Sequence, residues 1–238
     1  MMIDKIFFLN THNYFKKIAK DIIIPNIGKL SENEVSTKED NSKVTSYDVI
    51  VENKLIEYFK NIGFSNIISE ESNSELIKKN EYLTVDPIDG TRNFINGINK
   101  VAIMLSFIKS TQCEFAIIYD PIGDVFYHTH NNSIFKNHKQ IKPQNYSNQI
   151  GFLGEHAKVY FKGIITSYTE KIRSRSIGYD VIEAIEGGRS FLTVYGSKIW
   201  DLFPAMSFLK LLNFETNLPN MEFDYSKLEK KIIFYANL

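Results

Sequence analysis

The sequence predicts a layered α/β fold whose first half is mostly antiparallel sheet. Amphipathic segments with apolar residues at helical spacing occur at 13–30 and 47–62 and predict helices. Short apolar runs separated by turn residues follow one another between 101 and 128, which is typical of successive antiparallel strands. From residue 149 onwards, strand-like and helix-like segments alternate. Helices and strands are therefore expected to pack in layers around shared cores.

In the first half, the helix at 13–30 should kink at Pro25, and the helix at 47–62 should be capped by Thr45 or Ser46. The polar residues 31–46 between them predict a loop. The predicted strands are 66–69, a strand that stops at Asp86, 101–108, 114–119, 125–128, and a further strand with a turn at 135–143.

The second half predicts three helices and four strands. Gly187 and Gly188 should end the second of these helices. In chain order the segments are a strand at 149–153, a helix at 157–167, a strand at 173–176, a helix at 179–186, a strand at 191–195, a helix from 200 through 212, and a strand at 231–235.

No repeat or long linker divides the chain, so we expect one unit, 1–238, with lobes at about 1–145 and 146–238. Lys plus Arg equals Asp plus Glu at 28 each, so no net field favours nucleic acid or an anionic membrane as a partner. No apolar run is long enough for a bilayer, and no leader pattern opens the chain. The lone Cys113 excludes an intrachain disulfide and fits a reducing compartment, so we expect a cytoplasmic protein.

The segment 83–94 carries the strongest chemical signal. Pro87 holds Asp86 extended, and Gly90 lets the chain turn so that Asp86 and Asp89 can point into one space. Two such carboxylates need a cation between them, and the N–H groups of Gly90 and Thr91 suit an anion such as phosphate. The pattern predicts phosphate-ester or phosphoryl-transfer chemistry with a divalent metal. The alternative is a surface Asp-Pro turn followed by a capped helix.

Four blocks in order carry a family resemblance. Residues 38–48 resemble K-x-D-x-S-x-V-T-x-x-D, and 69–72 are similar to G-E-E-S, with serine in place of the first glycine. Residues 86–93 fit D-P-I-D-G-T-x-N, and 200–205 resemble W-D-x-A-A-G. The chain thus resembles, over nearly its whole length, the inositol monophosphatase family of magnesium-dependent, lithium-sensitive phosphatases. That group also includes fructose-bisphosphatase-like and nucleotide 3′-phosphatase members.

The resemblance implies an α-β-α-β-α sandwich that binds two to three Mg²⁺ ions. The first ion is expected on Glu70, Asp86 and the backbone carbonyl of Ile88. The second is expected on Asp86, Asp89 and Asp201, and a third, weaker ion near Glu70. Oxygen ligands of this kind also suit Mg²⁺ better than zinc on general grounds.

The resemblance also implies how such a site works. Thr91 and Asp48 should orient and help to deprotonate a metal-activated water, with Glu70 assisting and no phospho-enzyme formed. The N–H groups of Gly90 and Thr91 should hold the phosphate, and Lys38 should close over the site. A homodimer is expected from the family.

The substrate pocket departs from the inositol-specific members. Val194 stands where those members carry a glutamate, and Gly178-Tyr179-Asp180 replaces a Gly-Thr-Ala segment. The expected substrate contacts are Asp89, Gly90, Thr91, Lys38, Gly178, Tyr179 and Asp180. The expected activity is hydrolysis of a small, inositol monophosphate-like metabolite.

Two alternatives stay open for this function: a histidinol-phosphate or nucleotide 3′-phosphate phosphatase, and a regulatory protein that binds transcription machinery. The Asp-Gly-Thr-Arg segment that contains Arg92 is similar to the corresponding segment of histidinol-phosphate phosphatases. Arg173 and Arg175 alternate and are read as surface residues, with contact to a phosphate or a dimer partner as the alternative. The roles of the histidines are left open: His128, His130 and His156.

Overall fold

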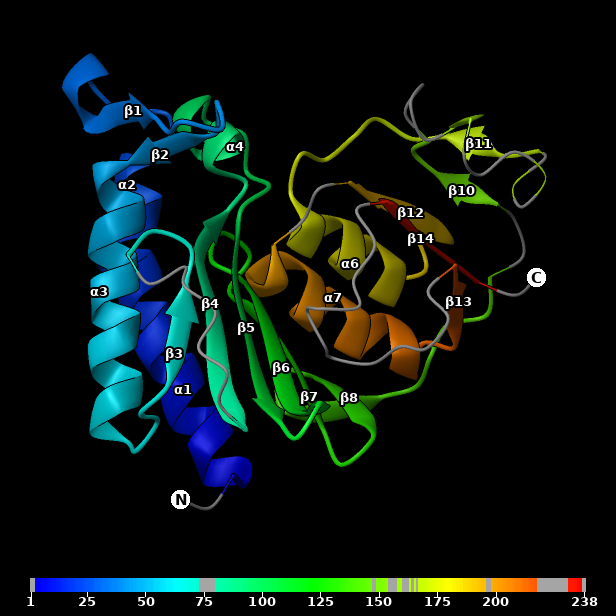
Figure 1. The fold of residues 1–238 in the computed structure, drawn as a ribbon, viewed down its shortest axis with the longest axis horizontal. Helices are drawn as coiled ribbons and strands as arrows, with labels where there is room; N and C mark the ends of the chain where they lie inside the picture. Colours follow the sequence, from blue (N-terminus) through cyan, green and yellow to red (C-terminus); the bar gives the residue numbers. More distant parts are fainter. Residues whose placement is uncertain are drawn as a thin grey trace.

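The computed structural model describes residues 3–72, 80–146, 149–153, 158–159, 163, 165, 167–195, 198–217 and 231–236. Figure 1 shows the arrangement: α1 to α3 cover one face of a large sheet, α6 and α7 cover the other face, and a small sheet follows. The predicted helix at 157–167 lies largely outside the described residues. Within the described ranges, every helix is too short or too polar to cross a bilayer.

The N-terminal helix begins earlier than predicted. Helix α1 (Lys5–Ile18) continues through the π-helical turn η1 (Ala19–Ile23) into α2 (Ile24–Asn26). The prediction of 13–30 was wrong at both ends because Asp4 caps the helix, accepting from the Phe7 N–H at 2.9 Å, and because the first turns pack on the sheet. Pro25 lies in α2 directly after the π-helical turn, and the chain leaves helical conformation at Ile27.

The second predicted helix is confirmed as α3 (Ser46–Asn61), with Thr45 as its cap. The loop predicted at 31–46 was wrong in part. It contains a 3-10 turn, η2 (Glu32–Glu34), and the antiparallel hairpin of β1 (Val35–Thr37) and β2 (Lys43–Thr45). These strands are short and carry mostly polar residues, so they lack the apolar alternation by which a strand is recognised in sequence.

The large sheet has the order β3-β4-β5-β6-β7-β8-β9, with β3 parallel to β4 and all other pairs antiparallel, so the mostly antiparallel first half is confirmed. The strand expected to stop at Asp86 was wrong at that end: it continues to Asp89, which still pairs with Ala102. The segment 135–143 is two strands rather than one, because Asn137 and His138 adopt positive φ and form a hairpin turn. The strands are β3 (Ile67–Ser69), β4 (Glu81–Asp89), β5 (Ala102–Lys109), β6 (Gln112–Asp120), β7 (Val125–His130), β8 (Ser133–Lys136) and β9 (Lys139–Ile141).

In the second half, the helices and long strands are confirmed: α6 (Ile177–Ile185), β12 (Phe191–Tyr195), α7 (Ile199–Leu211) and β14 (Lys231–Ala236). The small sheet has the order β12-β14-β13, and its edge strand β13 (Phe214–Thr216) was not predicted. The strand expected at 173–176 was wrong: β11 (Thr169–Glu170) pairs with β10 (Ile150–Gly151), and local serine hydrogen bonds keep 171–176 irregular.

Three apolar clusters hold the layers together. One lies between α1, α3 and the large sheet, the second holds α6 and α7 between the two sheets, and the third covers the outer face of the small sheet. The second cluster includes Ala102 and Met104 of β5, which pair with Asp89 and Asp86 in the last part of β4, and there polar groups replace apolar ones. This junction positions the candidate site.

Candidate active site

A β-bulge brings Asp86 and Asp89 to the same side of the sheet. Side chains three residues apart in a regular strand point to opposite faces. Here β4 pairs Asp86 with Met104 and Asp89 with Ala102, so β4 carries one extra residue and the alternation reverses. Both carboxylates therefore face α6 and α7, while Ile88 between them packs into the cluster on the other face. The predicted convergence of the two acids is confirmed.

Asp201 supplies the third carboxylate from the first turn of α7. One oxygen from each of Asp86, Asp89 and Asp201 lies within 4.8 Å of the other two. Asp86 and Asp89 are buried, at 1% and 8% exposed. These three predicted metal ligands thus form one compact cluster, although Asp201 lies far from the other two along the chain.

The start of α6 fixes the orientation of Asp89. Its carboxylate accepts hydrogen bonds from the Ser176 hydroxyl at 2.5 Å, the Ile177 N–H at 3.2 Å and the Gly178 N–H at 2.7 Å. A Cβ on Gly178 would lie 2.8 Å from the Cβ of Ala102, so only glycine allows this approach. The role of Ser176 was missed in the sequence, where a serine just before the predicted helix signals only a cap.

The cluster carries more negative charge than the protein around it compensates. Burial, followed by the nearby carboxylates of Glu70, Asp201 and Asp89, raises the pKa of Asp86 well above its usual range. Burial also raises the pKa of Asp89 and of Asp201, the latter further through Glu70. Buried like charges of this kind ionise together only when a cation lies between them. The donor set, all oxygen, fits Mg²⁺.

We expect Mg²⁺ to raise the melting temperature by roughly 5–10 °C at a hundredfold excess over its Kd, and this gain to shrink as the pH falls from about 8 to about 5. The raised carboxyl pKa values mean that folding favours the protonated acids, so protons compete with the cation at lower pH. Thermal denaturation with Mg²⁺ and with EDTA at each pH checks this. Subtracting the melting temperature in EDTA from that in Mg²⁺ at each pH cancels the effect of groups, such as His128, that titrate in both samples. A gain independent of pH would contradict the assignment.

Thr91 and Asp48 form the pair that the sequence predicts. The Thr91 hydroxyl lies 3.1 Å from the Asp48 carboxylate and 3.3 Å from the Ile88 carbonyl oxygen. Burial raises the pKa of Asp48 to about 6, although hydrogen bonds from Thr45 oppose this. Gly90 precedes Thr91 with φ +91°, and a Cβ there would lie 2.8 Å from the Lys100 carbonyl oxygen. The turn therefore requires glycine, and it places Thr91 beside the carboxylates.

Lys38 bridges two glutamates at the edge of the site. Its Nζ lies 3.0 Å from Glu70 Oε1 and 2.8 Å from the Glu71 carboxylate. Burial alone would lower the pKa of Lys38, but the two carboxylates raise it. Burial raises the pKa of Glu71 to about 7. Glu71 thus shares the Lys38 amine with Glu70.

A cavity of about 770 Å³ borders this site, and its lining includes Glu70, Gly90, Thr91, Arg92, Arg173 and Arg175. Two of the expected substrate contacts are already engaged with protein groups. Asp180 lies 3.1 Å from the buried Arg189 guanidinium, and the Tyr179 hydroxyl interacts with Asp120.

Val194 is buried in β12, at 3% exposed. It packs with Leu192 and Phe234 in the cluster that holds α6 and α7 between the two sheets. Val194, which replaces the glutamate of the inositol-specific members, is therefore a core residue.

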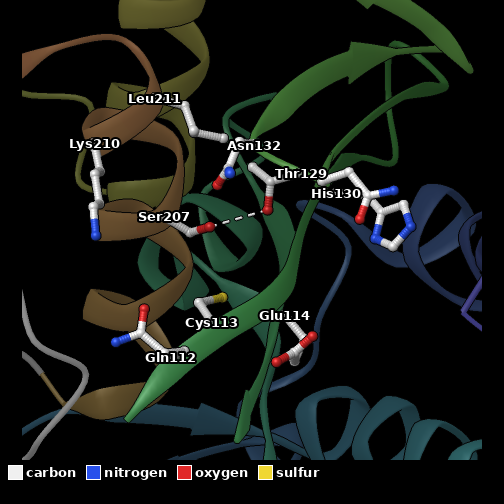
Figure 2. A pocket seen from close by; sticks show the side chains of 10 residues that line it. Gln112, Cys113, Glu114, Thr129, His130, Asn132, Ser207, Lys210 and Leu211 are labelled. Atoms are coloured by element: carbon white, nitrogen blue, oxygen red, sulfur yellow. Dashed lines mark hydrogen bonds between the residues drawn. The ribbon is translucent and has the colours of Figure 1, made fainter.

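Figure 2 shows a second cavity, of about 290 Å³, between α7 and strands β6 and β7. Cys113 and the hydrogen-bonded pair Thr129 and Ser207 line it, and none of the clustered carboxylates does. His128 stacks on Phe8 and Phe135 with ring centroids 3.8 Å and 4.7 Å away. Among the described residues, the carboxylate cluster is the single candidate metal group, and His128 and His130 do not belong to one. His156 lies outside the described residues.

The family model of the inositol monophosphatase family matches residues 8–203. The fructose-1,6-bisphosphatase/inositol-1-monophosphatase of Methanocaldococcus jannaschii is 28% identical over 137 residues, which are 56% of this chain and 54% of that protein. The Nus factor SuhB of Haemophilus influenzae is 30% identical over 106 residues, 44% of this chain and 40% of that protein. The matches span about half the length, or less, of these curated relatives.

A solved structure of an IMPase/NADP phosphatase complexed with Mg²⁺ and phosphate superposes with a TM-score of 0.77. It is 18% identical and covers 95% of this chain and 88% of that one. At this identity the likeness concerns the fold, and it agrees with the layered α/β sandwich that the family resemblance implies.

Proposed function

This chain belongs to the inositol monophosphatase family, and we propose that it is a Mg²⁺-dependent phosphomonoesterase acting on a small phosphorylated metabolite. One observation carries the proposal: three carboxylates lie within 4.8 Å of one another, next to a hydroxyl–carboxylate pair and beside a large cavity that Glu70 and Thr91 line. Converging oxygen ligands, a cavity and a water-orienting pair are the parts that metal-assisted ester hydrolysis requires.

The proposed metal ligands are Glu70, Asp86, Asp89 and Asp201 with the carbonyl of Ile88, for two ions and a third, weaker one near Glu70. Bound there, Mg²⁺ would supply the positive charge that attracts the phosphate oxygens and stabilises the charge of the displacement. The raised pKa values of the buried acids support this assignment, because they indicate negative charge for which the protein itself provides no partner.

The proposed role of Thr91 is to orient the attacking water. Its hydroxyl donates to Asp48, so its lone pairs remain available to accept a proton from water. As water gives a proton to Thr91, Thr91 gives its own to Asp48, whose pKa of about 6 lets it accept a proton near neutral pH. The water oxygen attacks phosphorus as the P–O bond of the ester breaks, and the leaving alcohol oxygen takes a proton from solvent, so no phospho-enzyme forms. Lys38 would hold Glu70 and Glu71 at the entrance.

The test is phosphate release from a panel of inositol-1-phosphate, histidinol phosphate, fructose-1,6-bisphosphate and adenosine 3′,5′-bisphosphate, with Mg²⁺ or EDTA and with added lithium. We expect release from at least one compound that requires Mg²⁺ and is inhibited by lithium. An equal rate in EDTA would contradict the proposed metal dependence. Absence of release from every compound, with Mg²⁺ binding shown by thermal shift, would contradict the proposed activity on this substrate class.

A regulatory protein that binds transcription machinery remains the second candidate, and the likeness over 106 residues to the Nus factor SuhB favours it. The zero net charge argues against direct RNA contact but allows protein partners. Retention of RNA polymerase subunits in a pull-down, together with no phosphate release from any compound of the panel, would support this candidate. Homodimer formation is likewise a prediction, which light scattering tests.

A further inference from the structure

Three arginines line the cavity beside the carboxylate cluster, and none of them pairs with a carboxylate of the described residues. Arg92 is the second residue of the short helix α4 (Thr91–Ile95), and Arg173 and Arg175 belong to the irregular segment that leads into α6. All three side chains are exposed. Within the described ranges, no carboxylate lies within 4 Å of any of the three guanidiniums, although Arg173 acts on Asp180 at longer range.

The other basic groups near the site already have partners. Lys38 pairs with Glu70 and Glu71. Lys100, Lys171 and Arg189 all pair with Glu183. The cavity lining also includes Asp40 and Lys43, and Lys43 donates to the Thr37 hydroxyl. The described groups therefore leave the three arginines, together with Lys43, without a paired carboxylate. Three guanidiniums lining one cavity repel one another, so an anion among them would be favourable.

Hydrogen bonds hold the three arginines close to the metal site. The Asn93 side-chain amide donates to the Ser174 carbonyl oxygen at 2.8 Å and to the Lys100 carbonyl oxygen at 2.7 Å, which ties α4 to the segment that carries the other two arginines. Ser176 in turn donates to Asp89. Arg173 and Arg175 alternate with the buried Ser174 and Ser176, so the serines face the protein and the arginines face the cavity.

We propose that the substrate carries a second phosphate group, away from the ester that is hydrolysed, and that Arg92, Arg173 and Arg175 bind it. This inference rests on the proposed function. The metal cluster would bind the scissile phosphate, so a neutral polyol would leave the three guanidiniums without a role. Guanidinium groups match phosphate oxygens with paired hydrogen bonds. A cavity of about 770 Å³ has room for a bisphosphorylated sugar or nucleoside.

The test compares matched substrates that differ by one phosphate: fructose-1,6-bisphosphate with fructose-1-phosphate, and adenosine 3′,5′-bisphosphate with adenosine 3′-phosphate. We expect kcat/KM for at least one bisphosphate to exceed that of its partner by about 10–100-fold, since hydrogen bonds between charged groups are worth that much. In the double variant Arg173→Gln/Arg175→Gln this ratio should fall towards one, mainly because KM for the bisphosphate rises. The exposed Lys139→Gln on β9 removes a distant positive charge and should leave the ratio unchanged.

Binding separates failure of this inference from failure of the proposed function. The Asp48→Asn variant should hydrolyse slowly while keeping the arginines, so calorimetric titration of the same pairs in Mg²⁺ reports affinity alone. If a bisphosphate binds more tightly than its monophosphate partner, and Arg173→Gln/Arg175→Gln weakens that binding, the second phosphate site is supported even where no hydrolysis is seen. Equal affinity for both members of each pair, or an equal loss for both in the double variant, would overturn it.

Discussion

Asp201→Asn is expected to lower phosphate release by at least about 1,000-fold, because electrostatic stabilisation by preorganised charge is usually the largest part of such catalysis. The change removes one of the three clustered carboxylates and keeps the shape of the side chain. Release is measured with the best substrate of the panel at saturating Mg²⁺. Asp89→Asn should have a similar effect, and it also replaces either the oxygen that accepts from Ser176 and Gly178 or the oxygen that accepts from Ile177.

The fold should survive this substitution. Burial and the charges of Glu70 and Asp89 raise the pKa of Asp201, so its charged form is unfavourable in the metal-free protein and Asp201→Asn should not lower the melting temperature in EDTA. Glu57→Gln removes an exposed carboxylate from α3 and serves as the control, with normal release expected. Near-normal turnover of the Asp201→Asn protein would show that the metal assignment is wrong.

Arg189→Met is expected to destabilise the fold by about 3–5 kcal/mol, the usual cost of leaving buried charges without their partner. Arg189 is 1% exposed, and its guanidinium lies 3.1 Å from Asp180 and 3.0 Å from Glu183. Burial opposes the charged form of Glu183, but Arg189 with Lys171 and Lys100 keeps the pKa of that carboxyl low. Thermal denaturation should show a loss of roughly 6–20 °C.

Acidification should reduce this loss. Without Arg189 the pKa values of Asp180 and Glu183 rise, so protonation at lower pH relieves the uncompensated charge. The deficit against wild type should therefore be smaller at about pH 5 than at about pH 8. Arg173→Met, at an exposed position close in sequence, should change the melting temperature little. An equally small change for Arg189→Met would contradict the buried ion-pair account.

Two members of the carboxylate cluster could be predicted to converge because they lie in one local motif. Asp86 and Asp89 are bracketed by Pro87 and Gly90, whose backbone preferences alone indicate that the two acids converge. Asp201 was placed by the family resemblance, since no local pattern connects α7 to β4. The bulge that brings the two acids to one face depends on pairing with β5 and is not visible in β4 itself.

Other features depend on tertiary contacts that the sequence does not display. The first turns of α1 have apolar residues, but the contacts of Phe8 with Phe115 and His128 are what define the start of the helix. The hairpin of β1 and β2 is short and mostly polar, so its sequence predicts a loop. The arrangement of Arg92 with Arg173 and Arg175 requires the Asn93 bridge between segments 81 residues apart, so the sequence shows them only as separate surface positions.

Calorimetric titration of Mg²⁺ into the wild-type protein and into Asp201→Asn, at about pH 8, tests the central claim most directly. If the buried carboxylates bind the metal, wild type shows saturable binding with protons released from the acids whose pKa is raised, and the variant binds at least about tenfold more weakly. Identical isotherms for the two proteins, or no binding to wild type, would contradict the claim that these carboxylates form a metal-dependent phosphatase site.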